Sequence, residues 1–315
     1  MSRTRTGEAR PEGEPAQGRY SIPVQAPYRL HLTVSALRRL PTNLVDVLTP
    51  DGAYVRLLGG ASNLAVVRVC QSGPAALTVE IEDDGGDHPR LLALVRRMLG
   101  VDVDLTRFYR SASRVAWLHP LVRRMRGVRP PRYPSIWEAC VNAVVFQQIS
   151  LRAASAIMGR LVTGLTEPVE RNGVRLYPFP TPGRVLRAPD SLLRGAGLSA
   201  GKLATLRRVA DALGTGAIDE PQLERLPSPD AAALLRSIKG IGSWTAVVIL
   251  LRGLGRLDVF PAHDTSVARN LTLVGAPAAL DVETLLDTLG AERGMLYYHL
   301  LLARLETRGA LSPSA

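Results

Sequence analysis

The sequence is poor in cysteine and has no long apolar stretch. Cys70 and Cys140 are the only cysteines among 315 residues, and they lie far apart, which excludes a disulfide framework and a cysteine-rich metal site. No segment resembles a signal peptide or stays apolar over the length that a membrane-spanning helix needs. From these absences we expect a cytoplasmic protein without a membrane partner.

Acidic residues are scarce relative to basic ones. The chain has 39 lysine and arginine residues against 28 aspartate and glutamate residues, a net charge of +11, and nearly all of the excess is arginine. This charge predicts an anionic partner, and nucleic acid fits best because guanidinium groups match phosphate geometry. Eight arginines occur without an intervening acid: Arg107, Arg110, Arg114, Arg123, Arg124, Arg126, Arg129 and Arg132. We interpret them as a surface that contacts or steers DNA, the alternative being a solvated face.

The apolar patterning of the chain changes twice. Residues 1–20 lack apolar periodicity and are predicted to form a disordered tail. Residues 21–86 are predicted to form a small α+β domain, with antiparallel strands at 28–34, 53–58, 64–69 and 77–81. Residues 87–312 are predicted to be helical, with Ser135, Ser150 and Ser228 as helix caps.

The most informative stretch is Leu235–Ala246, which has the pattern of a helix, a tight glycine turn and a second helix. Gly240 and Gly242 flank Ile241, which can fill the gap between the two helices. Glycine at both positions permits positive φ and close approach of a phosphate to the backbone. The free N–H groups that open the second helix also suit an anion. Because a carboxylate, Asp264, follows shortly afterwards, the stretch predicts chemistry on DNA.

These residues resemble the helix-hairpin-helix DNA glycosylases, in which a Gly/Pro-rich loop and a catalytic Asp follow the hairpin. Asp264 lies 264 − 244 = 20 residues after Trp244, as in that family, and Gly253, Gly255 and Pro261 supply the loop. Further segments that match lie at 144–150, 179–182 and 197–203. The order and spacing are closest to the branch typified by bacterial 3-methyladenine DNA glycosylase II.

The resemblance implies a mostly α fold. A two-lobed helical core, with the helix-hairpin-helix at 229–252, would carry a small N-terminal α+β domain and bind DNA between its lobes. It implies a monomer that needs no organic cofactor. A monovalent cation would be held by the carbonyls of Lys239, Ile241 and Gly242. The four-cysteine iron–sulfur cluster of some relatives is excluded, because the chain has two cysteines.

Asp264 is the candidate catalytic residue by this resemblance. A carboxylate below C1′ of the sugar stabilises the positive charge that develops when the N-glycosidic bond breaks, and it can orient a water. The alternative is that Asp264 caps the helix predicted at 265–273, and the two roles are compatible. Asp258 is the rival carboxylate, which we interpret as structural because it precedes the loop at Pro261.

Trp244 stands where relatives that also cleave the strand carry a nucleophilic lysine. An indole cannot form a Schiff base, so the residue predicts a monofunctional enzyme. Trp244, Tyr297 and Tyr298 are the candidate base pocket, since aromatic rings can stack on a cationic base. For Trp244, core packing is an equal alternative. His263 precedes the candidate catalytic residue and is interpreted as a bystander.

The resemblance also implies how DNA is held. Gln148, with Ile149 or Gln147 as alternates, would fill the hole left by the flipped base. Phosphates would be bound by two sets of residues, from the hairpin and from the arginine-rich stretch: Lys239, Gly240, Ile241, Gly242, Ser243 and Thr245, together with Arg123, Arg124 and Arg126.

The predicted function is excision of damaged bases, alkylated purines foremost, from double-stranded DNA, which leaves an abasic site. Two alternatives remain. One is a bifunctional oxidised-base glycosylase/lyase, against which Trp244 argues. The other is a non-catalytic helix-hairpin-helix DNA-binding protein, against which Asp264 argues.

Overall fold

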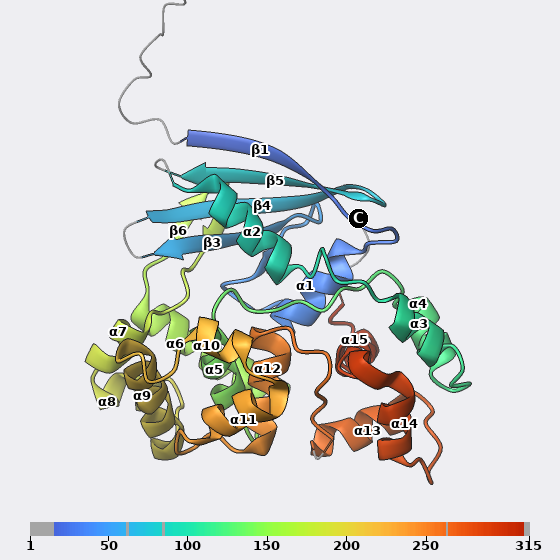
Figure 1. Ribbon diagram of the computed structural model, residues 1–315. Coiled ribbons are helices and arrows are strands. Elements are labelled where there is room, and N and C mark those ends of the chain that lie inside the picture. Colours follow the sequence, from blue (N-terminus) through green and yellow to red (C-terminus); the bar gives the residue numbers. More distant parts are fainter. Residues whose placement is uncertain (1–15, 61–62, 84–85, 263, 312–315) are drawn as a thin grey trace, which may run out of the picture.

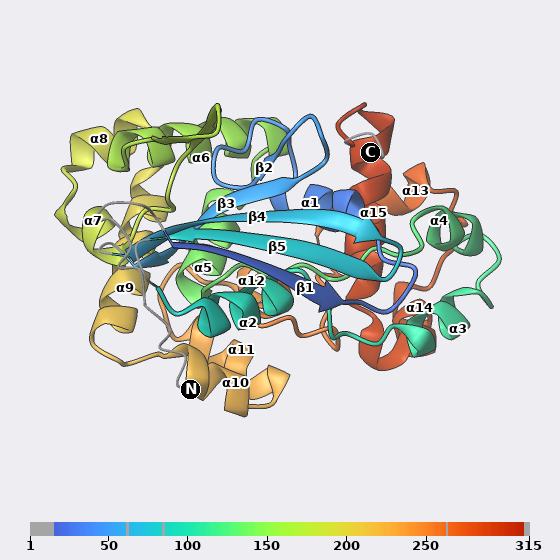
Figure 2. The same ribbon diagram turned by 90° about the horizontal axis from the view of Figure 1, so that it is seen from above.

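An antiparallel sheet lies across two groups of helices (Figures 1 and 2). The computed structural model describes residues 16–60, 63–83, 86–262 and 264–311. Within these ranges no helix is both long and apolar enough to cross a membrane. The prediction of a mostly helical, two-lobed core with a small N-terminal sheet is confirmed. His263 lies outside the described residues.

The sheet has the strand order β1-β5-β4-β3-β2, and its neighbours are antiparallel. Its strands are β1 (Ala16–Pro23), β2 (Val47–Leu48), β3 (Tyr54–Gly60), β4 (Asn63–Gly73) and β5 (Ala76–Asp83). Val69 pairs with Val79, and both are fully buried. Residues 16–20 were predicted to belong to the disordered tail, which is wrong, because they pair with β5 as the edge strand β1. Backbone pairing needs no apolar periodicity.

The strand predicted at 28–34 is also wrong, because most of it belongs to helix α1 (Leu30–Arg38). Leu30, Leu32 and Val34 alternate like the residues of a strand. In the structure every residue of α1 except His31 is buried, so the helix shows no amphipathic period that could identify it. The other three predicted strands correspond to β3, β4 and β5, except that Ala53 lies just before β3.

The first group of helices lies below the sheet and carries the hairpin. It contains α5 (Ile136–Val145), α6 (Leu151–Leu165), α7 (Pro182–Arg187), α8 (Asp190–Gly195), α9 (Ala200–Gly214), α10 (Glu220–Arg225), α11 (Ser228–Arg236) and α12 (Ser243–Gly253). A two-stranded hairpin, β6 (Val169–Arg171) and β7 (Val174–Leu176), follows α6, and α2 (His88–Met98) lies beside the sheet (Figure 2).

The second group packs around the C-terminal helix. It contains α3 (Thr106–Ala112), α4 (His119–Arg124), α13 (Thr265–Leu273), α14 (Val282–Leu289), the 3₁₀ turn Gly290–Glu292 and α15 (Met295–Thr307). Each group has its own cluster of buried apolar residues. Phe146 and Val259 pack against both clusters, so they lie where the two lobes meet.

Two of the three predicted serine caps are confirmed. Ser135 accepts a hydrogen bond from the Glu138 amide, and Ser150 accepts one from the Ala153 amide. Ser228 is not a cap, because α11 begins at this residue and Pro227 occupies the N-cap position.

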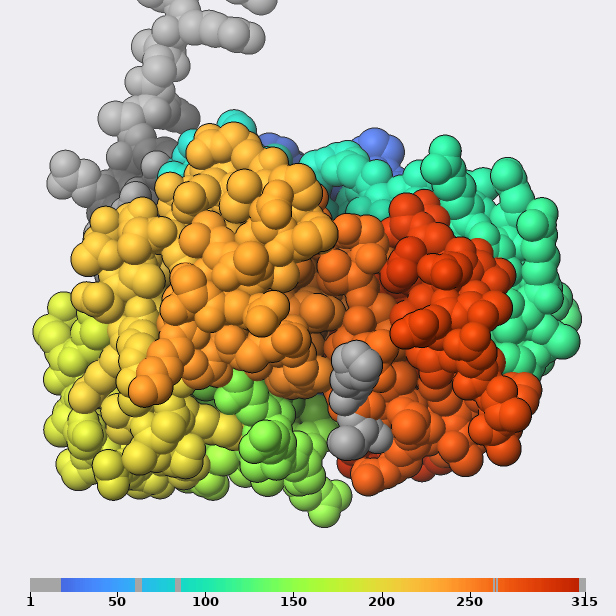
Figure 3. All heavy atoms as spheres, turned by 60° about the horizontal axis from the view of Figure 1, so that its bottom comes forward, coloured from blue at the N-terminus to red at the C-terminus, as the bar shows by residue number. Residues whose placement is uncertain are grey.

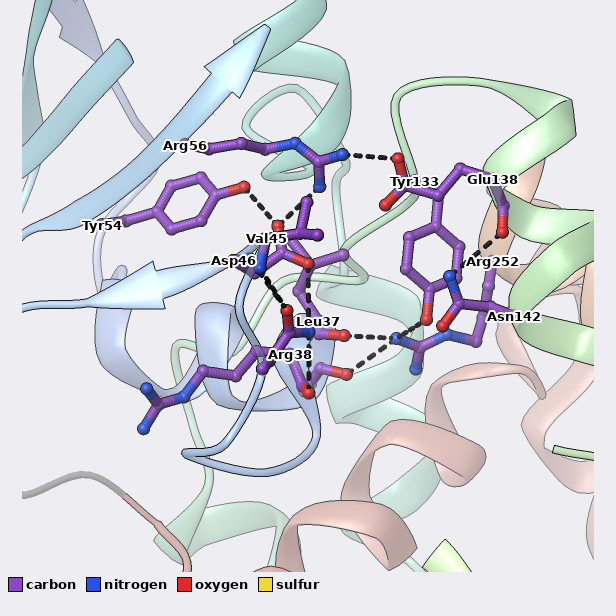
Figure 4. Close-up of polar contacts among 12 residues, drawn as sticks. Leu37, Arg38, Val45, Asp46, Tyr54, Arg56, Tyr133, Glu138, Asn142 and Arg252 are labelled. Atoms are coloured by element: carbon purple, nitrogen blue, oxygen red, sulfur yellow. Dashed lines mark hydrogen bonds and ion pairs between the residues drawn. The ribbon is translucent and has the colours of Figure 1, made fainter. Parts of the chain in front are cut away.

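Two buried arginines join the N-terminal part to the helices (Figure 4). Arg56 of β3 forms ion pairs with Asp46 and with Glu138 of α5. Arg252 of α12 donates from Nη2 to the carbonyls of Ala36 and Leu37, both at 2.9 Å. A buried charge left without its partners is costly, so these contacts fix the sheet and α1 against the helical core.

Candidate functional site

The hairpin between α11 and α12 turns at Gly240, which has the positive φ that glycine permits. Gly240 has φ 105, and an added Cβ would lie 1.9 Å from Thr205 Oγ1. Gly242 has an ordinary φ of −89, so the hairpin uses the positive φ that glycine permits at Gly240 and not at Gly242. No described atom lies within 4 Å of an added Cβ at Gly242, which leaves room for a phosphate. Ile241 is 4% exposed and fills the gap between the helices, as predicted.

The opening turn of α12 faces outward without a side-chain cap. Its N-cap is Gly242, which has no side chain to accept the first N–H groups. Lys239, Gly242 and Ser243 are exposed beside it. Thr245 was predicted to contact phosphate with the others, but its side chain is buried, and its hydroxyl accepts a hydrogen bond from Gln147 Nε2 at 2.7 Å. Exposed N–H groups and a lysine at one helix start form a site suited to an anion.

Two of the three carbonyls expected to hold a monovalent cation each accept a hydrogen bond within the protein. The Lys239 carbonyl accepts a hydrogen bond from the Arg208 guanidinium at 3.1 Å. The Gly242 carbonyl accepts the Ala246 amide at 2.9 Å, inside the helix. Each carbonyl oxygen has a second lone pair, so the cation at the hairpin stays a prediction.

Asp264 and Trp244 are brought together from opposite lobes. Trp244 Nε1 on α12 donates a hydrogen bond to Asp264 Oδ2 at 2.9 Å. Asp264 Oδ1 accepts the Ser266 amide at 2.8 Å, so the residue also caps α13, as predicted. Both side chains are half-buried. The carboxylate is therefore held at both oxygens beside the hairpin, while the rival Asp258 is exposed.

The turn after α5 presents the two predicted wedge residues to solvent. Gln148 has φ 54, an uncommon conformation for a residue other than glycine, and it is exposed. Ile149 next to it is 38% exposed. Figure 3 shows the surface hollowed between this green segment and the orange-red second lobe.

Two residues that hold this turn were missed or misplaced by the sequence analysis. Lys202 Nζ donates to the carbonyls of Val145 and Gln147 at 2.8 and 2.9 Å. Gln147 Nε2 donates to the Gly240 carbonyl at 3.1 Å, in addition to Thr245. Gln147 therefore connects the turn to the hairpin by hydrogen bonds, and its side chain is not free to enter the duplex. No sequence motif marks these contacts, because they span 55 to 98 positions of the chain.

The two candidate pocket tyrosines have different places. Tyr298 is fully buried, and its hydroxyl donates to the carbonyls of Pro131 and Leu251. The expectation that Tyr298 lines the base pocket is therefore corrected. Tyr297 is half-buried and close enough to Asp264 and Arg39 to interact with both electrostatically. Adjacent residues of a helix point about 100° apart, so only one of the pair can face the site.

Arg39, which the sequence analysis did not select, completes the group. It ends α1 with φ 65 and is 5% exposed. Its guanidinium carbon lies 3.9 Å from the centre of the Phe146 ring, and its positive charge acts on the Tyr297 hydroxyl. Although burial opposes ionisation, the positive charges of Arg39 and Arg252 lower the pKa of Tyr297 below its ordinary value.

The arginine-rich stretch is only partly a free surface. Arg129 is buried and donates to the Gln25 carbonyl, and Arg132 pairs with Glu220 and Glu224. Arg123, Arg124 and Arg126 are exposed at α4. The structure does not bring these three residues next to the hairpin, because α4 lies at the outer end of the second lobe (Figures 1 and 2). Among the described residues no cluster of His, Cys, Asp or Glu could hold a metal.

Comparisons with known proteins place this arrangement in a family. Residues 141–288, which include the hairpin and Asp264, match the model of the HhH-GPD superfamily of base excision DNA repair proteins. The chain belongs to this superfamily. A "Probable bifunctional transcriptional activator/DNA repair enzyme AlkA" of Mycobacterium tuberculosis is 30% identical over 271 residues, 82% of this chain and 51% of that protein. The "DNA-3-methyladenine glycosylase 1" of Schizosaccharomyces pombe is 34% identical over 151 residues, 47% of this chain and 62% of that protein.

The similarity to a solved glycosylase structure extends over nearly the whole chain. A solved structure of a 3-methyladenine DNA-glycosylase from Archaeoglobus fulgidus superimposes with a TM-score of 0.76 and 24% identity, covering 91% of this chain and 99% of that one. This likeness supports the fold alone. The chain spans between one half and two thirds of the length of the two curated relatives described above.

Proposed function

We propose that the protein is a monofunctional DNA glycosylase that excises damaged bases, alkylated purines foremost, from double-stranded DNA. The pairing of Asp264 with Trp244 beside an uncapped helix start carries this proposal. Relatives named as DNA-3-methyladenine glycosylases support alkylated purines as the substrate class. Solved relatives with the same fold are complexes with DNA, which supports DNA as the partner.

The reaction needs a carboxylate at one face of the sugar. When the bond between C1′ and the base nitrogen breaks, its electron pair leaves with the base and positive charge develops at C1′. Asp264 stabilises that charge, and one of its oxygens can orient the water whose oxygen then bonds to C1′. The hydrogen bonds from Trp244 and Ser266 keep the carboxylate in one orientation, so little reorganisation is needed during the reaction.

Binding and base flipping use surfaces on both sides of this carboxylate. The start of α12 holds a backbone phosphate, with Lys239 as a second positive group. Gln148 and Ile149 protrude from a strained turn and fill the gap in the duplex, which offsets part of the few kcal/mol that extrusion of a base costs. Lys202 and Gln147 brace that turn against α9 and the hairpin.

Strand cleavage would need an amine at C1′, and the chain contains only two lysines, Lys202 and Lys239. Burial lowers the pKa of Lys202, which would favour a nucleophile, but its Nζ is already bonded to two carbonyls. Lys239 is exposed on the far side of the glycine turn from Trp244. Neither amine is placed beside Asp264, which supports water as the nucleophile.

The test uses a panel of duplexes, each with one lesion and one labelled strand. We expect an intact abasic site, so the strand should break only after treatment with alkali. Borohydride should trap no covalent adduct between protein and DNA. A strong adduct that disappears in Lys202→Ala or Lys239→Ala would refute monofunctional chemistry. Absence of any alkali-sensitive product across the panel would refute glycosylase function.

A further inference from the structure

Helix α9 touches both the turn after α5 and the glycine hairpin. It packs beside α5 (Figure 1), and three of its residues, Lys202, Thr205 and Arg208, recur every three positions, so that each adjoins the next on the helix surface. Lys202 is bonded to the turn after α5. Thr205 lies against Gly240, and Arg208 Nη1 donates to the Lys239 carbonyl at 3.1 Å. One helix therefore fixes the distance between the turn and the hairpin.

Lys202 holds the turn at the peptide group that precedes Gln148. Its Nζ donates to the carbonyl of Val145, the last residue of α5, and to that of Gln147. A cation suits the carbonyls at the end of a helix, which have no partner inside it. The Gln147 carbonyl belongs to the peptide that sets one side of the φ of 54 at Gln148. Since a non-glycine residue keeps such a conformation only when its surroundings impose it, Lys202 helps to keep the wedge turn, residues 146–150, in shape.

Gln147 connects the wedge turn directly to the hairpin. Its Nε2 donates to the Gly240 carbonyl at 3.1 Å and to Thr245 Oγ1 at 2.7 Å. Thr245 is 3% exposed and lies in the first turn of α12, whose outward N–H groups are proposed to hold a phosphate. The wedge turn is thus tied to the phosphate site twice, through α9 and through this side chain.

We propose that Lys202 and Gln147 are positioning residues for base extrusion. They hold the wedge turn at a fixed place relative to the start of α12, so DNA bound by the hairpin meets a wedge that is already ordered and loses no freedom on insertion. The proposal rests on the glycosylase function proposed above and concerns its extrusion step. Asp264 is oriented by other groups, the indole of Trp244 and the Ser266 amide, so the two positioning residues act on extrusion and not on cleavage of the bond.

The experiment changes the cost of extrusion without changing the lesion. Single-turnover excision of N7-methylguanine is measured with saturating protein on two duplexes, one with the lesion paired to cytosine and one with it mispaired with adenine. A mispaired base costs less to extrude. Lys202→Met keeps an unbranched side chain and removes the charged donor. It should slow excision from the paired duplex by roughly 10-fold to 100-fold, the scale for a hydrogen bond from a charged group, and from the mispaired duplex by less than about threefold.

Three further variants separate positioning from folding. Gln147→Glu keeps the shape and replaces the donor with an oxygen that the Gly240 carbonyl repels, so it should show the same selective loss and serves if Lys202→Met does not fold. Lys202→Arg should recover part of the rate on the paired duplex. Arg194→Met, which removes an exposed charge from α8, should leave both rates unchanged.

Equal losses on the two duplexes, or no loss on either, in Lys202→Met and Gln147→Glu would overturn the positioning role while leaving the glycosylase function intact. If wild-type protein excises N7-methylguanine from neither duplex, the proposed function itself fails.

A second measurement follows insertion of the wedge without catalysis. The duplex carries 2-aminopurine, which fluoresces more when it is unstacked, next to the paired N7-methylguanine, and the protein carries Asp264→Asn. Saturating Asp264→Asn protein should raise the fluorescence, and the double variant that also carries Lys202→Met should raise it less at the same saturation. Equal rises in the single and double variants would contradict the proposed role of Lys202.

Discussion

Trp244→Phe tests whether the indole N–H orients the catalytic carboxylate. The substitution keeps an aromatic ring against the core and removes the donor that lies 2.9 Å from Asp264 Oδ2. A hydrogen bond to a charged group contributes about 1.5–3 kcal/mol. If that stabilisation is realised in the transition state, the rate of excision should fall by about 10-fold to 150-fold.

The assay is single-turnover excision from a lesion-bearing duplex, with affinity for the same duplex measured separately. Affinity should be nearly unchanged, because phosphate binding by the start of α12 uses backbone groups that the substitution leaves in place. The Ser266 amide still holds Oδ1, so the fold around α13 should persist. An excision rate within twofold of wild type would refute the positioning role of Trp244.

Three further predictions concern the hairpin, the buried junction and pH. Gly240→Ala should lower the thermal midpoint of unfolding, because the φ of 105 and the close approach of Thr205 exclude a Cβ. Gly242→Ala should leave the midpoint unchanged and weaken DNA binding. A Gly242→Ala variant that lowers the midpoint but binds DNA normally would contradict the anion site. Arg56→Met should cost about 3–5 kcal/mol in denaturant unfolding, since two buried carboxylates lose their partner, and a loss below 1 kcal/mol would contradict this. Burial lowers the pKa of His299 to about 4, so between pH 6.5 and 4 the unfolded chain binds a proton that the folded chain does not. As the pH falls through that window, the free energy of unfolding should therefore decrease by up to about 3 kcal/mol. His299→Gln should flatten this pH dependence.

The sequence predicted the parts of the site that depend on local pattern. The glycine turn, the start of α12 at Ser243 and the spacing from Trp244 to Asp264 are all readable within one short stretch. The spacing has a physical reason, since it lets α12 and the following loop bring the indole and the carboxylate into contact. The turn at Gln148 was predicted from its resemblance to the family's wedge-bearing turn, and the structure has a turn with a positive φ there.

The parts that could not be predicted depend on contacts between distant segments. Arg39 meets Phe146 and Tyr297 only after α1 has packed between the lobes, and α1 itself was mistaken for a strand because it is buried on nearly every side. Tyr298 was assigned to the pocket because aromatic rings can stack on a cationic base, but its hydroxyl is hydrogen-bonded inside the core. Periodicity locates elements, but it does not determine which faces meet.

The central claim is that Asp264 performs the chemistry, and Asp264→Asn tests it most directly. The variant keeps the size of the side chain and an oxygen for the Ser266 amide, while the negative charge is lost. Excision should fall by about 10² to 10⁴-fold with DNA affinity retained, and Asp258→Asn, at an exposed carboxylate on the same loop, should remain near wild type. Near-normal excision by Asp264→Asn, or a collapse with Asp258→Asn instead, would contradict the account.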